Sequence, residues 1–429
     1  MKIWSCDEPR GERMLTRLDG RLHEVLAGGI EDKVHKVLEA VRRRGDRALI
    51  SLVHRFDLKG LNVEDFRLHG QVGEPEEVGD EFVAAVELAL ANLKAFHELQ
   101  VPHGYTLERE TGDLAMKVRP LDSVGVYVPG GAAVYLSSLL MTVVPARLAG
   151  VKRIAVATPP RAFLTSPHLR YLLDRLDLRE VYLMGGAHAI GALAYGTESV
   201  AAVDKIVGPG GRWVTAAKRA VYGAVALDTV AGPSEVVVVA DGRADAEIAA
   251  AEMLAQAEHD QDAVAVLVTT SRPLGEKVDR RVTARLRSLP REAPVRTALK
   301  RWGAILLAEN LDQAAAVVNR IAPEHAVVLV EDPLRLVDRI ERAAAVYVGP
   351  WSSAVLGDYG VGTNHVLPTG GAARFSSPLG VADFTRWHAV VRVEAHGYPV
   401  LARAAATLAE VELLPLHAEA LRAGIRGRR

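Results

Sequence analysis

Side chains that could bind a metal ion recur at a few places in the second half of the chain. Gln256 and His259 lie three residues apart near the end of an Ala- and Glu-rich segment, and Asp358 and His417 follow much later. If the first segment is a helix, Gln256 and His259 share one of its faces. Nitrogen and oxygen donors without sulfur suit Zn²⁺ or a similar ion such as Mn²⁺. A lone histidine at a helix end is also commonly a surface polar group.

A second chemical pattern is the pair Glu324 and His325, which stands between a helix-like segment and an apolar run. A neighbouring carboxylate and imidazole can act as general base and proton shuttle near neutral pH. Taken alone, the pair is better explained as surface polar groups. Ser234 follows a Gly-Pro turn, but the sequence after it lacks the glycine of a nucleophile elbow. A serine hydrolase is therefore not supported.

The single cysteine limits the chemistry further. Cys6 is the only cysteine in the sequence, so disulfides within the chain and thiolate zinc sites are excluded, and it lies far in sequence from all of these clusters. An aldehyde oxidation in this protein would need a water molecule activated by a general base, because no cysteine is placed to form a thioester.

The composition is that of a soluble globular protein with more than one domain. The chain has 429 residues, a length that is too great for a single core. Its residues are 49% hydrophobic and 24% charged, as is usual for a globular protein. Its formal net charge of −1 provides no basic excess for binding nucleic acid. No apolar run reaches membrane-spanning length, and the charged N-terminus lacks the apolar core of a secretion signal. We therefore expect a cytoplasmic protein with no nucleic-acid or membrane partner.

Strand-like and helix-like segments alternate along the chain, which is typical of an α/β protein with parallel sheets. We expect two doubly wound, Rossmann-like domains with a helical N-terminal leader, a helical C-terminal tail and a ligand cleft between the two domains. The expected strands are 123–128, 153–157, 181–184, 205–207, 224–227, 236–239, 263–268, 303–307, 326–330 and 345–348, and the clearest helices are 31–54, 80–99, 135–150 and 311–321.

Glycines follow three of these strands at once, at Gly130–Gly131, Gly185–Gly186 and Gly208–Gly211. Glycine between a strand and a helix lets backbone N–H groups approach a phosphate at the positive end of the helix. None of the three has the full dinucleotide spacing, and each alone is explained as well by a tight turn. Three in succession favour a ligand crevice at one sheet edge. A further glycine-rich loop, 357–378, is long enough to be functional.

Taken together, these motifs resemble the histidinol dehydrogenase family over nearly the whole chain. The resemblance is carried by RRRGDRAL, VGVYVPGG, VDKIVGPG, AGPSEV with the downstream QAEH, APEH, and GDYGVGTNHVLPTGGAARFSSPL. It implies a homodimer that oxidises L-histidinol to L-histidine through L-histidinaldehyde, using NAD in two successive hydride transfers and one Zn²⁺ per subunit. It also implies that the C-terminal tail crosses to the partner subunit, so that the active sites are shared.

The resemblance assigns roles to particular residues. Glu324 and His325 match the catalytic pair of the family. The positions that match its metal ligands are Gln256, His259, Asp358 and His417. These four also match its substrate-binding positions, together with Ser234, His325, His365 and Glu412. The positions that match its NAD contacts are Tyr127, His188 and Gly211.

Departures from the family pattern fall mainly on the nucleotide side. The family usually has Gln at the position of His188, Asn at that of Gly211, and Gly at that of Leu413 in the tail. These changes leave open a related zinc- and NAD-dependent dehydrogenase acting on another small alcohol, such as a sulfonated diol. A zinc hydrolase is a third possibility, because a metal ion, Glu and His can also activate water for bond cleavage.

The expected domain limits follow from the same reading. Residues 1–24 form the leader, and 25–126 with 236–380 form the first Rossmann-like domain, which carries the metal and catalytic residues. Residues 127–235 form the second, nucleotide-binding domain, and residues 381–429 form the dimerisation tail.

Overall fold

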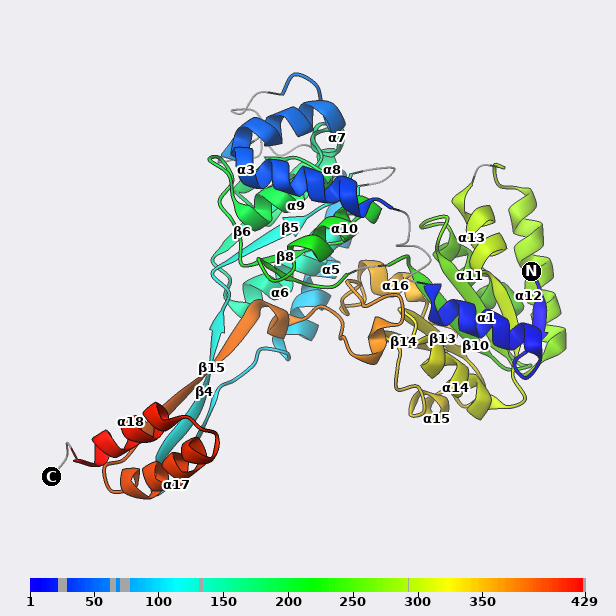
Figure 1. The fold of residues 1–429 in the computed structure, drawn as a ribbon. Coiled ribbons are helices and arrows are strands. Elements are labelled where there is room, and N and C mark those ends of the chain that lie inside the picture. The colour runs from blue at the N-terminus through cyan, green and yellow to red at the C-terminus, as the bar shows by residue number, and fades with distance from the viewer. Residues whose placement is uncertain are drawn as a thin grey trace.

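Two six-stranded sheets form the cores of two lobes, which lie side by side in Figure 1. In this computed structural model the described residues are 1–21, 29–61, 67–69, 78–130, 134–230, 232–291 and 293–426. The predicted α/β class and the alternation of strands with helices are confirmed. None of the helices in the described ranges combines the length and hydrophobicity needed to cross a membrane.

The first lobe, lobe A, contains a fully parallel sheet with strand order β1-β12-β11-β10-β13-β14. Its strand β10 (Glu235–Ala240) is buried at every position, as its β-branched sequence predicts. Helices α11, α12 and α13 pack on one face of the sheet, and α1, α14 and α15 on the other. The elements are β1 (Ile3–Ser5), β11 (Val264–Thr269), β12 (Ala304–Leu307), β13 (His325–Leu329), β14 (Ala345–Val348), α1 (Pro9–Asp19), α11 (Ala246–Ala257), α12 (Arg272–Arg287), α13 (Pro294–Trp302), α14 (Leu311–Ile321), α15 (Pro333–Val337) and α16 (Ala354–Tyr359).

The second lobe, lobe B, contains the sheet β2-β7-β6-β5-β8-β9, parallel except for β2. The strand order reverses between β5 and β8, which is the topological switch point of a doubly wound fold. Helices α3, α9 and α10 pack together, as do α5, α6 and α8. The elements are β2 (Arg67–His69), β5 (Ser123–Tyr127), β6 (Arg153–Thr158), β7 (Glu180–Leu183), β8 (Lys205–Val207), β9 (Ala226–Leu227), α3 (Glu31–Phe56), α5 (Asp80–Glu98), α6 (Leu136–Ala149), α7 (Pro160–Thr165), α8 (Pro167–Arg175), α9 (Gly186–Tyr195) and α10 (Arg212–Val221).

The packing corrects the expected grouping of the chain. Val34 and Leu38 of α3 and Leu93 of α5 lie in the same core as the strands of lobe B, so this part of 25–126 does not belong with 236–380. The expected leader is instead part of lobe A, because β1 pairs with β12 and Leu18 of α1 lies in the lobe A core. An amphipathic helix must bury its apolar face, but its sequence pattern does not say against which sheet. Residues 22–28, which span the expected boundary, lie outside the described residues.

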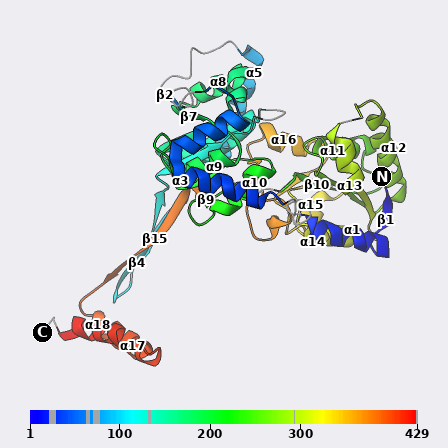
Figure 2. The same ribbon diagram turned by 45° about the horizontal axis from the view of Figure 1, so that its top comes forward.

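An antiparallel ribbon projects from lobe B and carries the C-terminal helices at its far end (Figures 1 and 2). It consists of β3 (Tyr105–Leu107), β4 (Gly112–Pro120) and β15 (Thr385–Val393), which pair in the order β15-β4-β3. Helices α17 (Tyr398–Val411) and α18 (Pro415–Arg426) pack against each other beyond it. We call β15, α17 and α18 the C-terminal arm. The tail was expected to be helical, but it begins with the long strand β15. This strand was missed because its partner β4 lies far away in sequence.

Candidate active site

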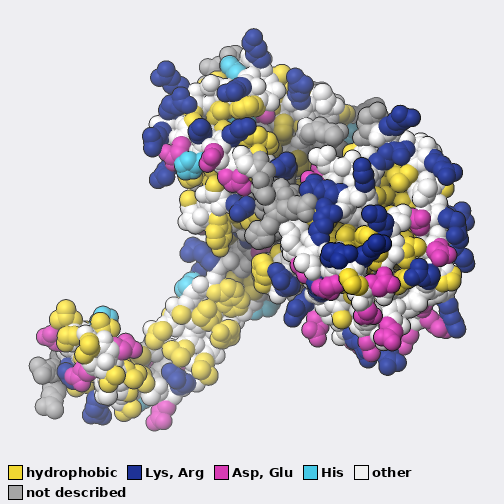
Figure 3. Space-filling view, turned by 45° about the vertical axis from the view of Figure 1, so that its right-hand side comes forward, with side chains coloured by type: hydrophobic (Ala, Val, Ile, Leu, Met, Phe, Trp, Pro, Cys, Tyr) yellow, Lys and Arg dark blue, Asp and Glu magenta, His cyan; other side chains and the backbone are white. Residues whose placement is uncertain are grey.

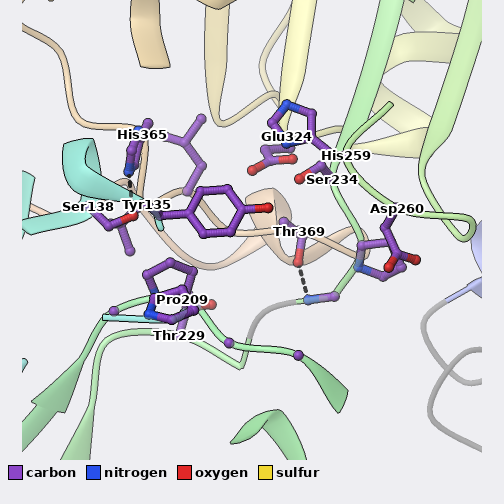
Figure 4. A pocket seen from close by; sticks show the side chains of 18 of the residues that line it. Tyr135, Ser138, Pro209, Thr229, Ser234, His259, Asp260, Glu324, His365 and Thr369 are labelled. Carbon is purple, nitrogen blue, oxygen red and sulfur yellow. Dashed lines mark hydrogen bonds between the residues drawn. The ribbon is translucent and has the colours of Figure 1, made fainter. Parts of the chain in front are cut away.

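A pocket between the two lobes collects most of the residues singled out in the sequence (Figure 4). Lobe A contributes the amino end of its sheet, where β10 and β13 begin. Lobe B contributes the carboxyl end of its sheet, where the loop after β8 leads into α10. The lining includes Pro129, Tyr135, Ser138, Gly208, Pro209, Gly210, Gly211, Thr229, Ser234, His259, Asp260, Glu324, His325, Asp358, His365 and Thr369. The expectation of a cleft between the two domains is thus met.

The two walls of the pocket differ electrostatically because opposite helix ends face it. Helix α11 ends just before His259, and α14 ends just before Glu324, so the negative ends of these helices point toward the lobe A wall. Helix α10 begins directly after Gly211, so a positive helix end points toward the pocket from lobe B. The lobe A wall therefore favours a cation, whereas the lobe B wall favours an anionic group such as a phosphate.

Glu324 and His325 are both held by the main chain of one residue, Glu235, at the start of β10. The Glu235 N–H donates to Glu324 Oε2 at 2.8 Å. The carbonyl oxygen of Glu235 accepts a hydrogen bond from His325 Nδ1 at 3.0 Å, so Nδ1 carries a proton and Nε2 keeps its lone pair. His325 Nε2 is buried and has no hydrogen-bond partner within the described residues. Both residues are buried, so neither is a polar group at a surface turn.

Burial shifts the pKa values of this pair in opposite directions. It lowers the pKa of His325 to about 4, so the imidazole is neutral near pH 7 and can accept a proton at Nε2. It raises the pKa of Glu324 well above that of an ordinary glutamate, and the nearby Glu235 and Asp358 carboxylates add to the increase. Groups with such shifts, placed in a pocket, are typical of acid–base chemistry.

Three of the four predicted metal ligands lie near one another on lobe A. His259 and Asp358 line the pocket, at the ends of α11 and α16. Gln256 is buried, and its amide nitrogen has no hydrogen-bond partner among the described side chains and backbone. Burial raises the pKa of Asp358 to about 6, and the carboxylate of Glu252 contributes to this rise. Over the described ranges, no three His, Cys, Asp or Glu residues form a group that could hold a metal ion.

The loop 357–378 forms one side of the pocket and is well anchored. His365 Nδ1 donates to the Asp358 carbonyl oxygen at 2.8 Å, and His365 Nε2 accepts from the Ser138 hydroxyl at 3.2 Å. Thr369 Oγ1 accepts the Gly232 N–H, which fixes the turn before Ser234. Figure 4 shows Ser234, His259 and Glu324 close together, with the Tyr135 ring between them and Pro209.

Several lining residues were not found from the sequence. Tyr135, Ser138 and Thr369 are polar residues in helix-like or loop sequence, without a motif that marks them. The only signal for Thr369 was its place in the glycine-rich loop.

The predicted nucleotide contacts are only partly exposed to the pocket. Gly211 lines it and is the N-cap of α10, with open space where a side chain would project. Tyr127 and His188 are buried next to the start of α9. The Tyr127 hydroxyl accepts the Gly186 N–H at 3.0 Å, and His188 Nε2 donates to Asp57 Oδ2 at 2.8 Å.

Carboxylates already occupy donors in two of the three glycine turns. Asp57 accepts the Gly185 N–H at 2.9 Å, and Asp228 accepts the Gly208 N–H at 2.7 Å. These two N–H groups are therefore not available to a phosphate. Gly131 of the first turn lies outside the described residues.

Glu412 and His417 are predicted site residues that lie away from this pocket. Both are exposed on the C-terminal arm, at the end of α17 and in α18. Figures 1 and 2 show these helices well separated from both lobes. Within one chain, therefore, the metal and substrate positions are only partly assembled.

Comparison with known proteins supports one family. The family model described as histidinol dehydrogenase matches residues 23–425. The chain is 43% identical to a histidinol dehydrogenase of Thermotoga maritima, covering 89% of each protein, and 42% identical to one of Methanothermobacter thermautotrophicus, covering 99% of each. It also resembles the crystal structure of a histidinol dehydrogenase from Elizabethkingia anophelis, with a TM-score of 0.89 and 32% identity over 100% of this chain and 98% of that one.

Proposed function

The chain belongs to the histidinol dehydrogenase family, whose members are NAD-dependent oxidoreductases of histidine biosynthesis, and we propose that its inter-lobe pocket oxidises L-histidinol in two steps with His325 and Glu324 as the proton-transfer groups. The observation that carries this assignment is the shared anchoring of both side chains on Glu235. This anchoring leaves His325 Nε2 on the pocket wall as a neutral base, without a hydrogen-bond partner among the described residues.

The first oxidation needs a base for the alcohol proton. His325 Nε2 takes this proton while the carbinol carbon loses a hydride, and the product is the aldehyde. Glu324 then takes a proton from a water molecule that adds to the aldehyde carbon, and the protonated His325 returns its proton to the aldehyde oxygen, which gives the hydrate. Loss of a proton and a second hydride from the hydrate gives the carboxylic acid. NAD⁺ serves as the hydride acceptor, and two are consumed for each histidinol.

A zinc ion fits the lobe A wall. Gln256, His259 and Asp358 of one subunit would hold it, together with His417 of the partner subunit. The donors are nitrogen and oxygen atoms, with Gln256 contributing its amide oxygen, and helix α11 directs its negative end toward them. When bound, the ion would orient the imidazole and amine of the substrate.

The nucleotide fits the lobe B wall. The pocket reaches the switch point between β5 and β8, where dinucleotides bind in doubly wound folds. We assign the diphosphate to the start of α10, with Gly211 in direct contact. Tyr127 and His188 would act on nucleotide binding indirectly, by holding the start of α9 in place.

A homodimer with shared sites accounts for the C-terminal arm. Among the described residues, the buried cluster between α17 and α18 consists of Ala406, Ala409 and Ala418, with the partly buried Leu421 against it, which is a small core for two helices. Apolar residues of the arm remain exposed, including Leu408, Val411, Leu413 and Leu416. Figure 3 shows hydrophobic side chains gathered along the projecting ribbon and its terminal helices.

A matching apolar surface lies at the mouth of the pocket. Tyr359 of α16 lines the pocket but is 63% exposed, and Leu356, one turn earlier, is 50% exposed. An arm from a second copy would cover such a surface and carry the partner's Glu412 and His417 to the pocket.

Measuring NADH with L-histidinol, with and without a chelator, tests the proposal. Two NADH for each histidinol, lost on chelation, is the expected result. NADH from a sulfonated diol but not from histidinol would favour the related dehydrogenase instead, and hydrolysis without NADH would favour a zinc hydrolase. The comparisons with known proteins do not favour either alternative.

A further inference from the structure

The side chain of Glu235 is buried in an ion pair that lies directly behind the catalytic pair. Glu235 is 0% and Arg21 is 2% exposed. Arg21 Nη2 donates to Glu235 Oε2 at 2.7 Å, and Arg21 Nε donates to the other carboxylate oxygen. The pair is therefore bidentate, the geometry in which an arginine most firmly fixes a carboxylate.

Other contacts of this ion pair reach the segments on both sides of the pocket wall. Arg21 Nη2 also donates to the carbonyl oxygen of Ile321 at 3.0 Å, at the end of α14 and three residues before Glu324. Arg21 Nη1 donates to the carbonyl oxygen of Leu18 at 2.6 Å. Glu235 Oε1 accepts the N–H of Gly370 at 2.9 Å, in the loop that carries His365. One ion pair thus connects the N-terminal segment, α14, β10 and the glycine-rich loop.

We propose that Arg21 and Glu235 are positioning residues for the oxidation, because their ion pair fixes the main-chain N–H and C=O groups that hold Glu324 and His325. This inference rests on the proposed roles of Glu324 and His325. The main chain of Glu235 sets the direction of the Glu324 carboxylate and the tautomer of His325, and the ion pair prevents the start of β10 from shifting. A displacement of about 1 Å at such a site can reduce the rate by about 100-fold.

A purely stabilising role is the alternative, and the position of Arg21 allows the two to be separated. Arg320 also connects the N-terminal segment with α14, through Glu12 at 2.8 Å and Asp19 at 3.0 Å, but it does not line the active-site pocket. It is therefore a matched control for the loss of an arginine contact between the N-terminal segment and α14.

The test compares Arg21→Lys, the double variant Arg21→Met/Glu235→Gln, and Arg320→Lys. Lysine keeps the charge but cannot form the bidentate contact. The double variant leaves no unpaired buried charge, so it remains informative if Arg21→Lys fails to fold. Steady-state kinetics with L-histidinol are measured together with the number of histidinol-binding sites per subunit by calorimetry, so that each turnover number refers to folded sites only.

The expected result is a fall in kcat of about 10- to 100-fold for both Arg21 variants, with KM for histidinol changed by less than about threefold. Arg320→Lys should keep the wild-type kcat. Wild-type kcat per binding site in the Arg21→Lys and double variants would overturn the inference, since only stability would then depend on the ion pair. Separate His325→Gln and Glu324→Gln variants with wild-type turnover would instead refute the proposed roles of those two residues.

Discussion

The substitution Glu324→Gln should separate the two oxidations proposed for this pocket. Glu324 Oε2 accepts the Glu235 N–H at 2.8 Å, and a glutamine side-chain oxygen can accept the same hydrogen bond. The two side chains have nearly the same volume, so the surrounding packing is retained. The change removes only the carboxylate that accepts a proton from the water attacking the aldehyde.

Loss of a general base slows the step that depends on it by about 10²- to 10⁴-fold. This corresponds to an increase of about 3–5 kcal/mol in the activation free energy. In the proposed mechanism the first oxidation uses His325 as its base, so its rate should change by less than about tenfold. The variant should therefore release one NADH for each histidinol and accumulate the aldehyde.

The same substitution should stabilise the metal-free protein at neutral and alkaline pH. Burial raises the pKa of Glu324 above that of the unfolded chain, so the ionised form is disfavoured in the folded state. The stabilising contribution of the protonated glutamate is complete below the unfolded pKa and is lost as the pH rises through the folded pKa. Glutamine does not titrate, so the difference in melting temperature between variant and wild type should increase with pH.

Stopped-flow measurement of NADH formation, started with either L-histidinol or L-histidinaldehyde, gives the two rates separately. Equal losses in both half-reactions would contradict the division of roles between Glu324 and His325. An aldehyde oxidation rate close to that of the wild type would show that another group activates the water.

Three further predictions follow from the arm and the two pocket walls. Leu413 has a positive φ of 59°, a backbone conformation that costs a non-glycine residue about 1–2 kcal/mol. The substitution Leu413→Gly should therefore raise the denaturation midpoint. A lower midpoint would argue against strain at this position. Gly211→Asn should lower the KM for NAD⁺, because the position is open and asparagine can cap α10; a higher KM would place the nucleotide elsewhere. Removing the metal should abolish histidinol oxidation but leave NAD⁺ binding measurable by calorimetry, since the two sites are assigned to different lobes. Loss of both together would mean that they are not separate.

The fold class and most of the pocket could be predicted because their signals are local. The β-branched run at the start of β10 indicates a strand buried on both faces, and the structure buries every one of its positions. Asparagine is a favoured N-cap residue, and the helix expected over 311–321 begins directly after Asn310, whose side chain accepts the Gln313 N–H at 2.9 Å. Local signals of this kind placed Glu324 at the junction of α14 and β13.

Long-range pairings could not be predicted in the same way. Strand β15 pairs with β4, and Arg21 meets Glu235, across more than two hundred residues of sequence. Neither partner carries a pattern that identifies the other. The grouping of α3 and α5 with lobe B was missed for the same reason, because their apolar faces would fit either sheet. The residues at the far end of the arm, Glu412 and His417, could be assigned to the site only through the family resemblance.

In the proposed active site, His259 and Asp358 share an ion with His417 of the partner subunit, beside Glu324 and His325. Mixed dimers of His417→Ala and Glu324→Ala, two variants that should each form little histidine, test this arrangement, with histidine formation as the measured activity. In a purified mixed dimer, one pocket has both defects and the other has neither, so about half of the wild-type activity should return. Verified mixed dimers without activity would contradict the shared site and place the arm against its own subunit.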